Sequence, residues 1–183
     1  MNKIYDDFHE AYATTLFDLL FFPEHQNVES RIGKSSEITQ YSFTLRNPDS
    51  KFIMPPMRNF RFEFAKNFFD WIWSGDPDMS KMIPLNENTT KYMDKDMSGR
   101  NTAYGPRIVE QREDIINELL RDVNSRRATF MILYPQDIGM LLDSFNGKTK
   151  QEFPCTIAIQ ILIRKNKLDL YAVMRSNNAF TTL

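Results

Sequence analysis

The chain has 183 residues, 42% of them hydrophobic, which suffices for one well-packed domain that we expect to span residues 1–183. Its 23 basic and 24 acidic residues nearly cancel, which argues against a nucleic acid polymer or an anionic membrane as partner. The single cysteine excludes an internal disulfide, and no run approaches the roughly 18 apolar residues of a membrane span, so we expect a cytoplasmic protein.

The first half of the chain is predicted to hold two helices and one strand. Apolar residues recur at helical spacing from Lys3 to Phe21, and Pro23 follows them. An alternating stretch predicts a strand at Ile38–Leu45, before the turn "NPDS". A second helix is expected at Phe64–Trp73, where "SGDPD" comes soon after its end.

The second half is predicted to begin irregularly, because Met79–Arg100 shows no clean period. Apolar residues then mark a third helix between Ile108 and Leu120, and "ATFMILY" at Ala128–Tyr134 predicts a buried strand. "TIAIQILI" and "LDLYAVM" are joined by "RKNK", which is typical of a hairpin. The pattern predicts an α+β architecture, with helices packed on a mixed, largely antiparallel sheet.

Several kinds of site are excluded by residue counts. With only His9, His25 and one cysteine, the chain cannot assemble the usual zinc ligand sets, and we expect no metal. It also contains neither a P-loop nor a dinucleotide-binding glycine pattern.

The remaining candidates for a functional site are Cys155 and four arginines near the ends of predicted helices and strands: Arg31, Arg126, Arg127 and Arg175. A lone cysteine is usually a small buried hydrophobe, and a lone arginine is usually a solvated surface charge. If they meet, however, the positive charges favour the thiolate, while guanidinium groups bind phosphate through paired hydrogen bonds. Covalent catalysis on a phosphorylated small molecule is then possible.

Six short motifs occur in order along most of the chain: "SRIG" at 30–33, "WIWSGDPD" at 71–78, "AYG" at 103–105, "DVNSRR" at 122–127, "FPCT" at 153–156 and "MRSN" at 174–177. Together they resemble the thymidylate synthase superfamily, and most closely its phage branch of pyrimidine nucleotide hydroxymethylases. The resemblance implies a thymidylate synthase-like fold and, for a phage-encoded protein, the host cytoplasm.

The same resemblance implies the chemistry. Cys155 would be the nucleophile that adds to C6 of a pyrimidine nucleoside monophosphate, and 5,10-methylenetetrahydrofolate would be the cofactor that provides a one-carbon unit to C5. Tyr104 would belong to the wall behind the ring. Thr156 follows the cysteine where thymidylate synthases usually have histidine, which favours a hydroxymethyl product over a methyl product.

Phosphate binding and assembly follow from the resemblance as well. Arg31, Arg175 and Ser176 would hold the 5'-phosphate of the nucleotide. The family forms homodimers, so Arg126 and Arg127 would reach the phosphate in the partner subunit.

Two acids of the family pattern are replaced. The glutamate three residues before the helix tryptophan is Phe68 here, and Asp70 and Glu63 fall on other faces of the predicted helix. The aspartate that contacts the folate is Asn178, whose amide forms hydrogen bonds but carries no charge. The chain also stops at Leu183, shortly after the last motif, and we expect it to be C-terminally incomplete.

These observations leave three hypotheses. The leading one is a C5 hydroxymethyl- or methyltransferase acting on dUMP, dCMP or CMP. The alternative is a catalytically impaired relative that serves as a nucleotide-binding or structural subunit. In the third, the fold is as expected and the arginines form only surface ion pairs.

Overall fold

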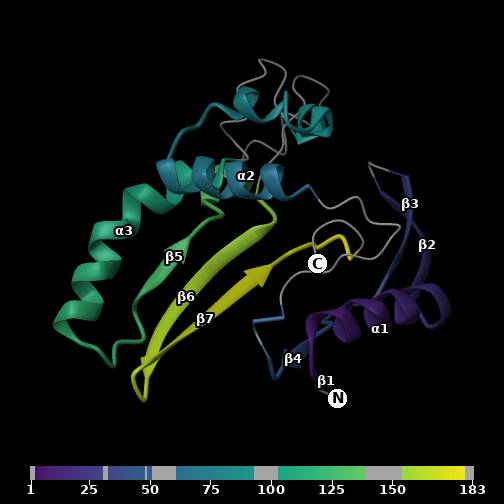
Figure 1. The fold of residues 1–183 in the computed structure, drawn as a ribbon, viewed down its shortest axis with the longest axis horizontal. Coiled ribbons are helices and arrows are strands. Elements are labelled where there is room, and N and C mark those ends of the chain that lie inside the picture. The colour runs from purple at the N-terminus through teal and green to yellow at the C-terminus, as the bar shows by residue number, and fades with distance from the viewer. Residues whose placement is uncertain are drawn as a thin grey trace. The chain divides into compact units, whose positions relative to one another are not determined.

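The structure is a computed structural model that describes residues 3–30, 33–47, 49–50, 61–92, 103–138 and 154–179. The chain divides into two units, one made of Met1–Phe60 with Asn177–Leu183 and the other of Arg61–Ser176. Helices and strands occur in both units, which confirms the α+β class (Figure 1). Among the described residues, no helix is long and apolar enough to cross a membrane. One domain over residues 1–183 stays a prediction.

In the N-terminal unit, helix α1 (Phe8–Phe21) follows a short strand, β1 (Lys3–Tyr5). The predicted helix start at Lys3 is therefore wrong. Asp7 decides the boundary, because its carboxylate accepts a hydrogen bond from the Glu10 amide at 2.8 Å and caps the helix. The residues ahead of the cap pair in parallel with strand β4 (Phe43–Leu45).

The same unit contains an antiparallel pair of strands, β2 (His25–Ser30) and β3 (Gly33–Glu37). The predicted strand at Ile38–Leu45 is wrong in extent, because only its last three residues, those of β4, are extended. Gln40 explains the interruption: its φ is 51°, a left-handed conformation that a continuous strand does not contain.

The second unit contains the other two predicted helices, α2 (Phe62–Ser74) and α3 (Tyr104–Arg121), each starting a few residues earlier than predicted. They approach closely where two glycines meet. A Cβ at Gly105 would lie 2.5 Å from the Ile72 carbonyl oxygen, and a Cβ at Gly75 would lie 2.8 Å from a methyl carbon of Val109. This contact holds the start of α3 against the end of α2.

Two short 3-10 helices, η1 (Met79–Met82) and η2 (Glu87–Tyr92), lie in the stretch without a clean period. Irregular structure is therefore confirmed up to residue 92, and 93–100 lie outside the described residues. The methionines that begin and end η1 pack with Trp71 and Ala103 in one of the two cores of this unit.

Three antiparallel strands complete this unit in the order β5 (Thr129–Met131), β6 (Thr156–Arg164) and β7 (Lys167–Met174). The predicted hairpin is confirmed. Its two turn residues, Lys165 and Asn166, have φ values of 51° and 58°, as a type I′ turn requires.

Strand β5 is shorter than the predicted strand at Ala128–Tyr134, because its ladder is broken after Met131. The amides of Ile132 and Leu133 both donate to the Ile157 carbonyl oxygen, at 2.9 and 3.0 Å. Two donors on one acceptor cannot continue the regular antiparallel register. The chain therefore leaves the sheet at this point.

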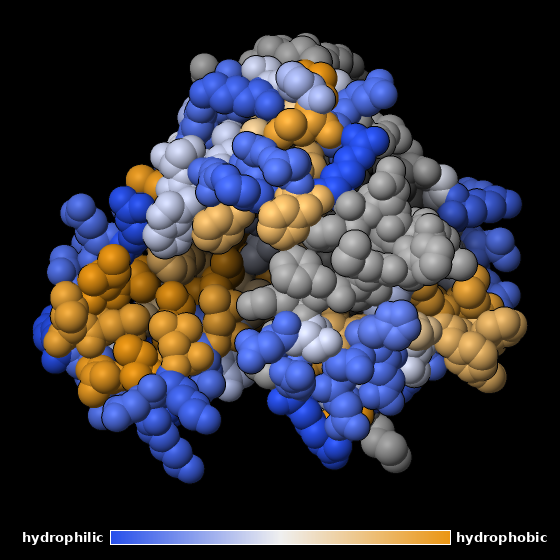
Figure 2. Space-filling view, in the orientation of Figure 1, coloured by the Kyte–Doolittle hydropathy of each residue, from blue (hydrophilic) through white to orange (hydrophobic). Residues whose placement is uncertain are grey.

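The sheet has an inner face against α3 and an opposite outer face. Phe130, Ile159 and Ile161 are on the inner face and pack with Ile115 of α3. The outer face carries, among others, Met131, Ala158, Leu162, Tyr171 and Val173. Tyr171 and Val173 are each 55% exposed. Figure 2 shows hydrophobic side chains at the surface of the part of this unit that holds β6 and β7.

Candidate active site

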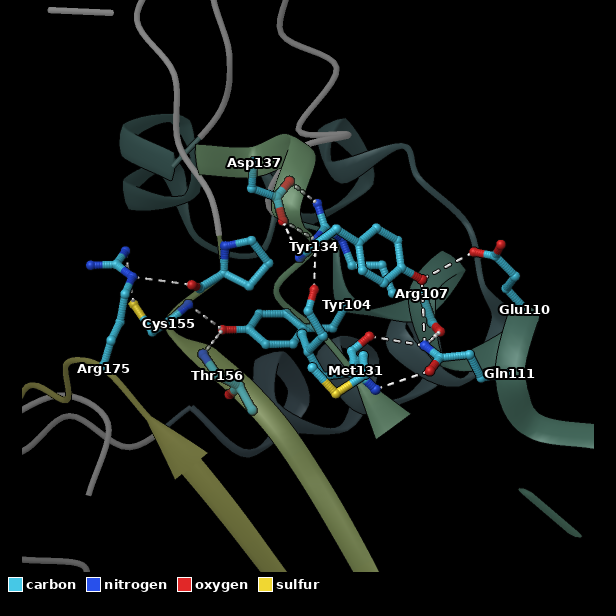
Figure 3. Close-up of polar contacts among 12 residues, drawn as sticks. Tyr104, Arg107, Glu110, Gln111, Met131, Tyr134, Asp137, Cys155, Thr156 and Arg175 are labelled. Atoms are coloured by element: carbon cyan, nitrogen blue, oxygen red, sulfur yellow. Dashed lines mark hydrogen bonds and ion pairs between the residues drawn. The ribbon is translucent and has the colours of Figure 1, made fainter. Parts of the chain in front are cut away.

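Cys155 lies directly before β6, between two buried neighbours, Pro154 and Thr156, and its own side chain is half-buried. Its amide donates a hydrogen bond to the hydroxyl oxygen of Tyr104 at 3.1 Å, and the Thr156 amide donates to the same oxygen at 3.5 Å (Figure 3). Tyr104 is the first residue of α3. The helix start and the cysteine are therefore joined directly.

Arg175 reaches Cys155 because β7 runs antiparallel to β6, which brings the end of one strand beside the start of the other. The Arg175 amide donates to the Cys155 carbonyl at 2.9 Å, and its Nε donates to the Pro154 carbonyl at 3.2 Å. One guanidinium nitrogen, Nη2, lies 3.9 Å from the Cys155 sulfur. A positive charge thus stands beside the chain's only thiol, and it remains exposed to solvent.

The structure does not bring Arg126 and Arg127 to this site. They precede β5, and the Arg126 carbonyl accepts a hydrogen bond from the side chain of Gln160 at 2.9 Å. Gln160 is five residues along β6 from Cys155, which corresponds to roughly 16 Å of extended strand. Within one chain, the paired arginines therefore lie beside the middle of β6, whereas the cysteine lies at its start.

Arg127 forms an ion pair within its own chain. Its Nε donates to a carboxylate oxygen of Glu118 at 2.8 Å, although the Arg127 side chain remains 70% exposed. A hydrogen bond from the Ser125 hydroxyl, and then the charges of Arg121 and Arg127, hold the pKa of Glu118 below its usual value. This contact agrees, for Arg127, with the third hypothesis, in which the arginines form only surface ion pairs.

The remaining predicted site residues lie in different parts of the chain. Ser176 follows Arg175 and is exposed. Asn178 is exposed as well and belongs to the N-terminal unit, which is described separately. Arg31 lies outside the described residues. The roles of all three stay predictions.

Phe68 takes part in the apolar packing of α2. Its ring centroid lies 5.5 Å from that of Trp71 and 5.7 Å from that of Phe64. The neighbouring polar groups point elsewhere, since Asp70 pairs with Lys66 at 3.0 Å and the Asn67 amide donates to a helix carbonyl at 2.7 Å. No carboxylate described on α2 therefore replaces the side chain at position 68. Among all the described residues, no group of three or more potential metal ligands is found.

A buried polar cluster beside this site was not predicted. Arg107 and Asp137 form a bidentate ion pair, with nitrogen–oxygen distances of 2.6 and 2.8 Å, and Tyr134 lies over the guanidinium. Burial, and then a hydrogen bond to Glu110, raise the pKa of Tyr134. One sequence signal exists: "YPQD" places proline and aspartate where the first turn of a helix prefers them. Nothing in the sequence points to Arg107 as the partner.

One comparison with known proteins supports the family resemblance. No family model matches the chain. It is similar to a deoxyuridylate hydroxymethyltransferase of Bacillus phage SP01. The two are 26% identical over 159 residues, which cover 78% of this chain and 39% of that relative. The chain thus spans about two fifths of the relative's length.

Proposed function

We propose that this chain is a pyrimidine nucleotide C5 hydroxymethyltransferase or methyltransferase of the thymidylate synthase type, with Cys155 as its nucleophile. The observation that carries the proposal is the contact between Cys155 and Arg175, 3.9 Å from guanidinium nitrogen to sulfur, beside the hydroxyl of Tyr104. The similarity to a phage deoxyuridylate hydroxymethyltransferase supports it. The substrate is dUMP, dCMP or CMP.

In the proposed reaction, the Cys155 thiolate forms a bond to C6 of the pyrimidine, and the electron pair of the C5–C6 double bond moves to C5. A bound 5,10-methylenetetrahydrofolate would supply the electrophilic one-carbon unit that C5 attacks. Loss of the C5 proton and of the folate nitrogen from the one-carbon unit would leave an exocyclic methylene at C5 while the sulfur is still bound to C6. Capture of this methylene by water would give the hydroxymethyl product, whereas capture of a hydride from the tetrahydrofolate would give methyl. In both cases the sulfur–C6 bond then breaks and the C5–C6 double bond is restored.

The chain's own residues have separate tasks in this scheme. Arg175 and Ser176 would hold the 5'-phosphate, which is also the role proposed for Arg31, and Tyr104 orients the backbone that carries the thiol. Asn178 suits the folate only as a neutral hydrogen-bonding partner, because its amide carries no charge. The proposed cofactor therefore binds here without the negative charge that the family's aspartate provides.

The proposed assembly is a homodimer. Arg126 and Arg127 are separated from Cys155 by roughly 16 Å along β6, so one chain cannot direct all of these arginines at one phosphate. A two-fold axis across the outer sheet face would allow each copy to supply them to its partner. Tyr171 and Val173 on that face are exposed apolar residues that such an interface would cover.

Release of tritium from [5-³H]dUMP or [5-³H]dCMP in the presence of methylenetetrahydrofolate tests the proposed turnover. We expect release by the parent protein and its loss in Cys155→Ala, which has no nucleophile. Glu113→Ala, an exposed change on α3, is the matched control and should leave release unchanged. A parent protein that binds nucleotide but releases no tritium would contradict the proposal.

A second candidate function is a nucleotide-binding subunit without turnover. The packing of Phe68 against Trp71, where the family has a glutamate, favours it. This function predicts nucleotide binding, measured by calorimetry, that is lost in Arg175→Ala and retained in Cys155→Ala, with no exchange at C5. A failure to bind any pyrimidine monophosphate would contradict both functions.

A further inference from the structure

The ion pair of Arg107 and Asp137 is nearly excluded from solvent. Arg107 is 8% exposed and Asp137 is 2% exposed, and two parallel nitrogen–oxygen contacts join them. Asp137 also accepts a hydrogen bond from the Tyr134 amide at 2.7 Å, while the Tyr134 ring centroid lies 4.8 Å from the guanidinium carbon. The pair therefore has a fixed geometry, held from several sides.

Two routes connect Arg107 to the start of β6, directly after the residue that carries the thiol. In the first, a guanidinium nitrogen of Arg107 donates to the Ile132 carbonyl at 2.5 Å, and the Ile132 amide donates to the Ile157 carbonyl at 2.9 Å. Ile157 is two residues beyond Cys155. The segment that Arg107 contacts is thus hydrogen-bonded to the start of β6.

The second route runs along α3. Arg107 is three residues after Tyr104, so both side chains project from the same side of the helix, about one turn apart. Tyr104 accepts the hydrogen bonds of the Cys155 and Thr156 amides. A guanidinium fixed by Asp137 therefore limits how the first turn of α3 can move relative to the cysteine.

Stability alone is a weak reason for such a pair. Removing two charges from water costs about as much free energy as their attraction returns, and apolar residues of similar size often stabilise a protein equally well. What an apolar pair cannot provide is the directional grip on the Ile132 carbonyl and on the Tyr134 amide. The contribution particular to this pair is therefore positional.

We propose that Arg107 and Asp137 are positioning residues for the nucleophile: their ion pair holds Tyr104 and the start of β6 in register, so that Cys155 faces the nucleotide. The expected effect of this ion pair on catalysis rests on the proposed function. Its structural consequence, the rigidity of the Cys155 backbone, can be measured without any turnover.

The test replaces the pair by Arg107→Met with Asp137→Leu and follows three quantities: melting temperature, amide hydrogen exchange by peptide, and tritium release from C5. We expect a folded protein in which exchange of the peptide with Cys155 and Thr156 rises about tenfold, while exchange in the β6–β7 turn stays unchanged. The kcat for release should fall at least about tenfold, with a smaller change in the KM for nucleotide.

Two further variants keep the test decisive. Arg107→Lys retains the charge but not the paired hydrogen bonds, and it should reproduce the local rise in exchange if the double variant does not fold. Lys66→Ala removes an exposed ion pair on α2 and should change none of the three quantities.

The proposal is overturned if the variants of the pair alter exchange in all segments alike, as loss of global stability would, or if the Cys155 peptide exchanges as in the parent. If the parent releases no tritium, the proposed function fails while the exchange result still decides the positioning role. If exchange rises locally but kcat is unchanged, the backbone effect is real and the catalytic role is rejected.

Discussion

Replacement of Gly105 by alanine probes the helix contact that sets the position of Tyr104. The new Cβ would lie 2.5 Å from the Ile72 carbonyl oxygen and 3.1 Å from the Gly75 Cα, whereas ordinary Cβ contacts begin at 3.4 Å. Both neighbours are backbone atoms, so no side chain can rotate away to relieve the overlap. The start of α3 must move away from α2, and Tyr104 moves with it.

The size of the effect follows from two opposed contributions. Overpacking lowers the free energy of unfolding by about 1–3 kcal/mol. Because the new Cβ contacts rigid backbone, we expect the upper end of this range, about 3 kcal/mol. Alanine is favoured over glycine within a helix by about 1 kcal/mol. The expected net loss in the free energy of unfolding is about 2 kcal/mol. For a chain of this size, the melting temperature should fall by about 4–8 °C.

Thermal unfolding followed by circular dichroism measures this loss. Glu113→Gly and Glu113→Ala, compared with each other, provide the difference in helix propensity at an exposed site on the same helix. If Gly105→Ala proves as stable as the parent, or more stable by the margin seen at position 113, the packing argument is refuted.

Two further predictions concern other parts of the same unit. Because the pKa of Glu118 is lowered in the folded state, its stabilising effect is complete above its unfolded pKa of about 4.3 and is lost as the pH falls through the folded value. Urea unfolding should therefore show Glu118→Gln more destabilised relative to the parent at pH 7 than at pH 3, and an equal difference at both values would contradict the pKa shift. Lys165 has a φ of 51°, which costs a side chain with Cβ about 1 kcal/mol, so Lys165→Asn with Asn166→Gly should raise the melting temperature by about 2–4 °C. A fall, with Asn166→Gly alone as control, would refute the turn assignment.

The elements that could be predicted are those whose pattern is local. The hairpin of β6 and β7 follows from alternating isoleucines and a polar turn, and α3 follows from apolar residues at helical spacing. The predicted start of α1 is wrong because Ile4 and Phe8 have the spacing of residues on one helix face. Asp7, between them, instead caps the helix and sets its first residue at Phe8. In that case one side-chain hydrogen bond outweighs the periodicity.

The site was predicted in part for a similar reason. Cys155, Tyr104 and Arg175 are adjacent in the structure, yet only family motifs indicated that they belong together, since 51 residues separate the first two along the chain. Arg107 and Asp137 escaped prediction because an arginine on an amphipathic helix is expected to be solvated. Its burial depends on a segment 30 residues later, which no local pattern reveals.

The packing of Phe68 bears on what a glutamate at position 68 would do. The Phe68 ring lies among Phe64, Trp71 and the apolar residues around η1, so a carboxylate introduced there would be partly withdrawn from water without a described partner. Phe68→Glu should therefore lower stability before it restores any proton relay. Phe68 cannot relay a proton, so any turnover must use another group. The Tyr104 hydroxyl, 3.1 Å from the Cys155 amide nitrogen, is one described group near the thiol that carries a proton.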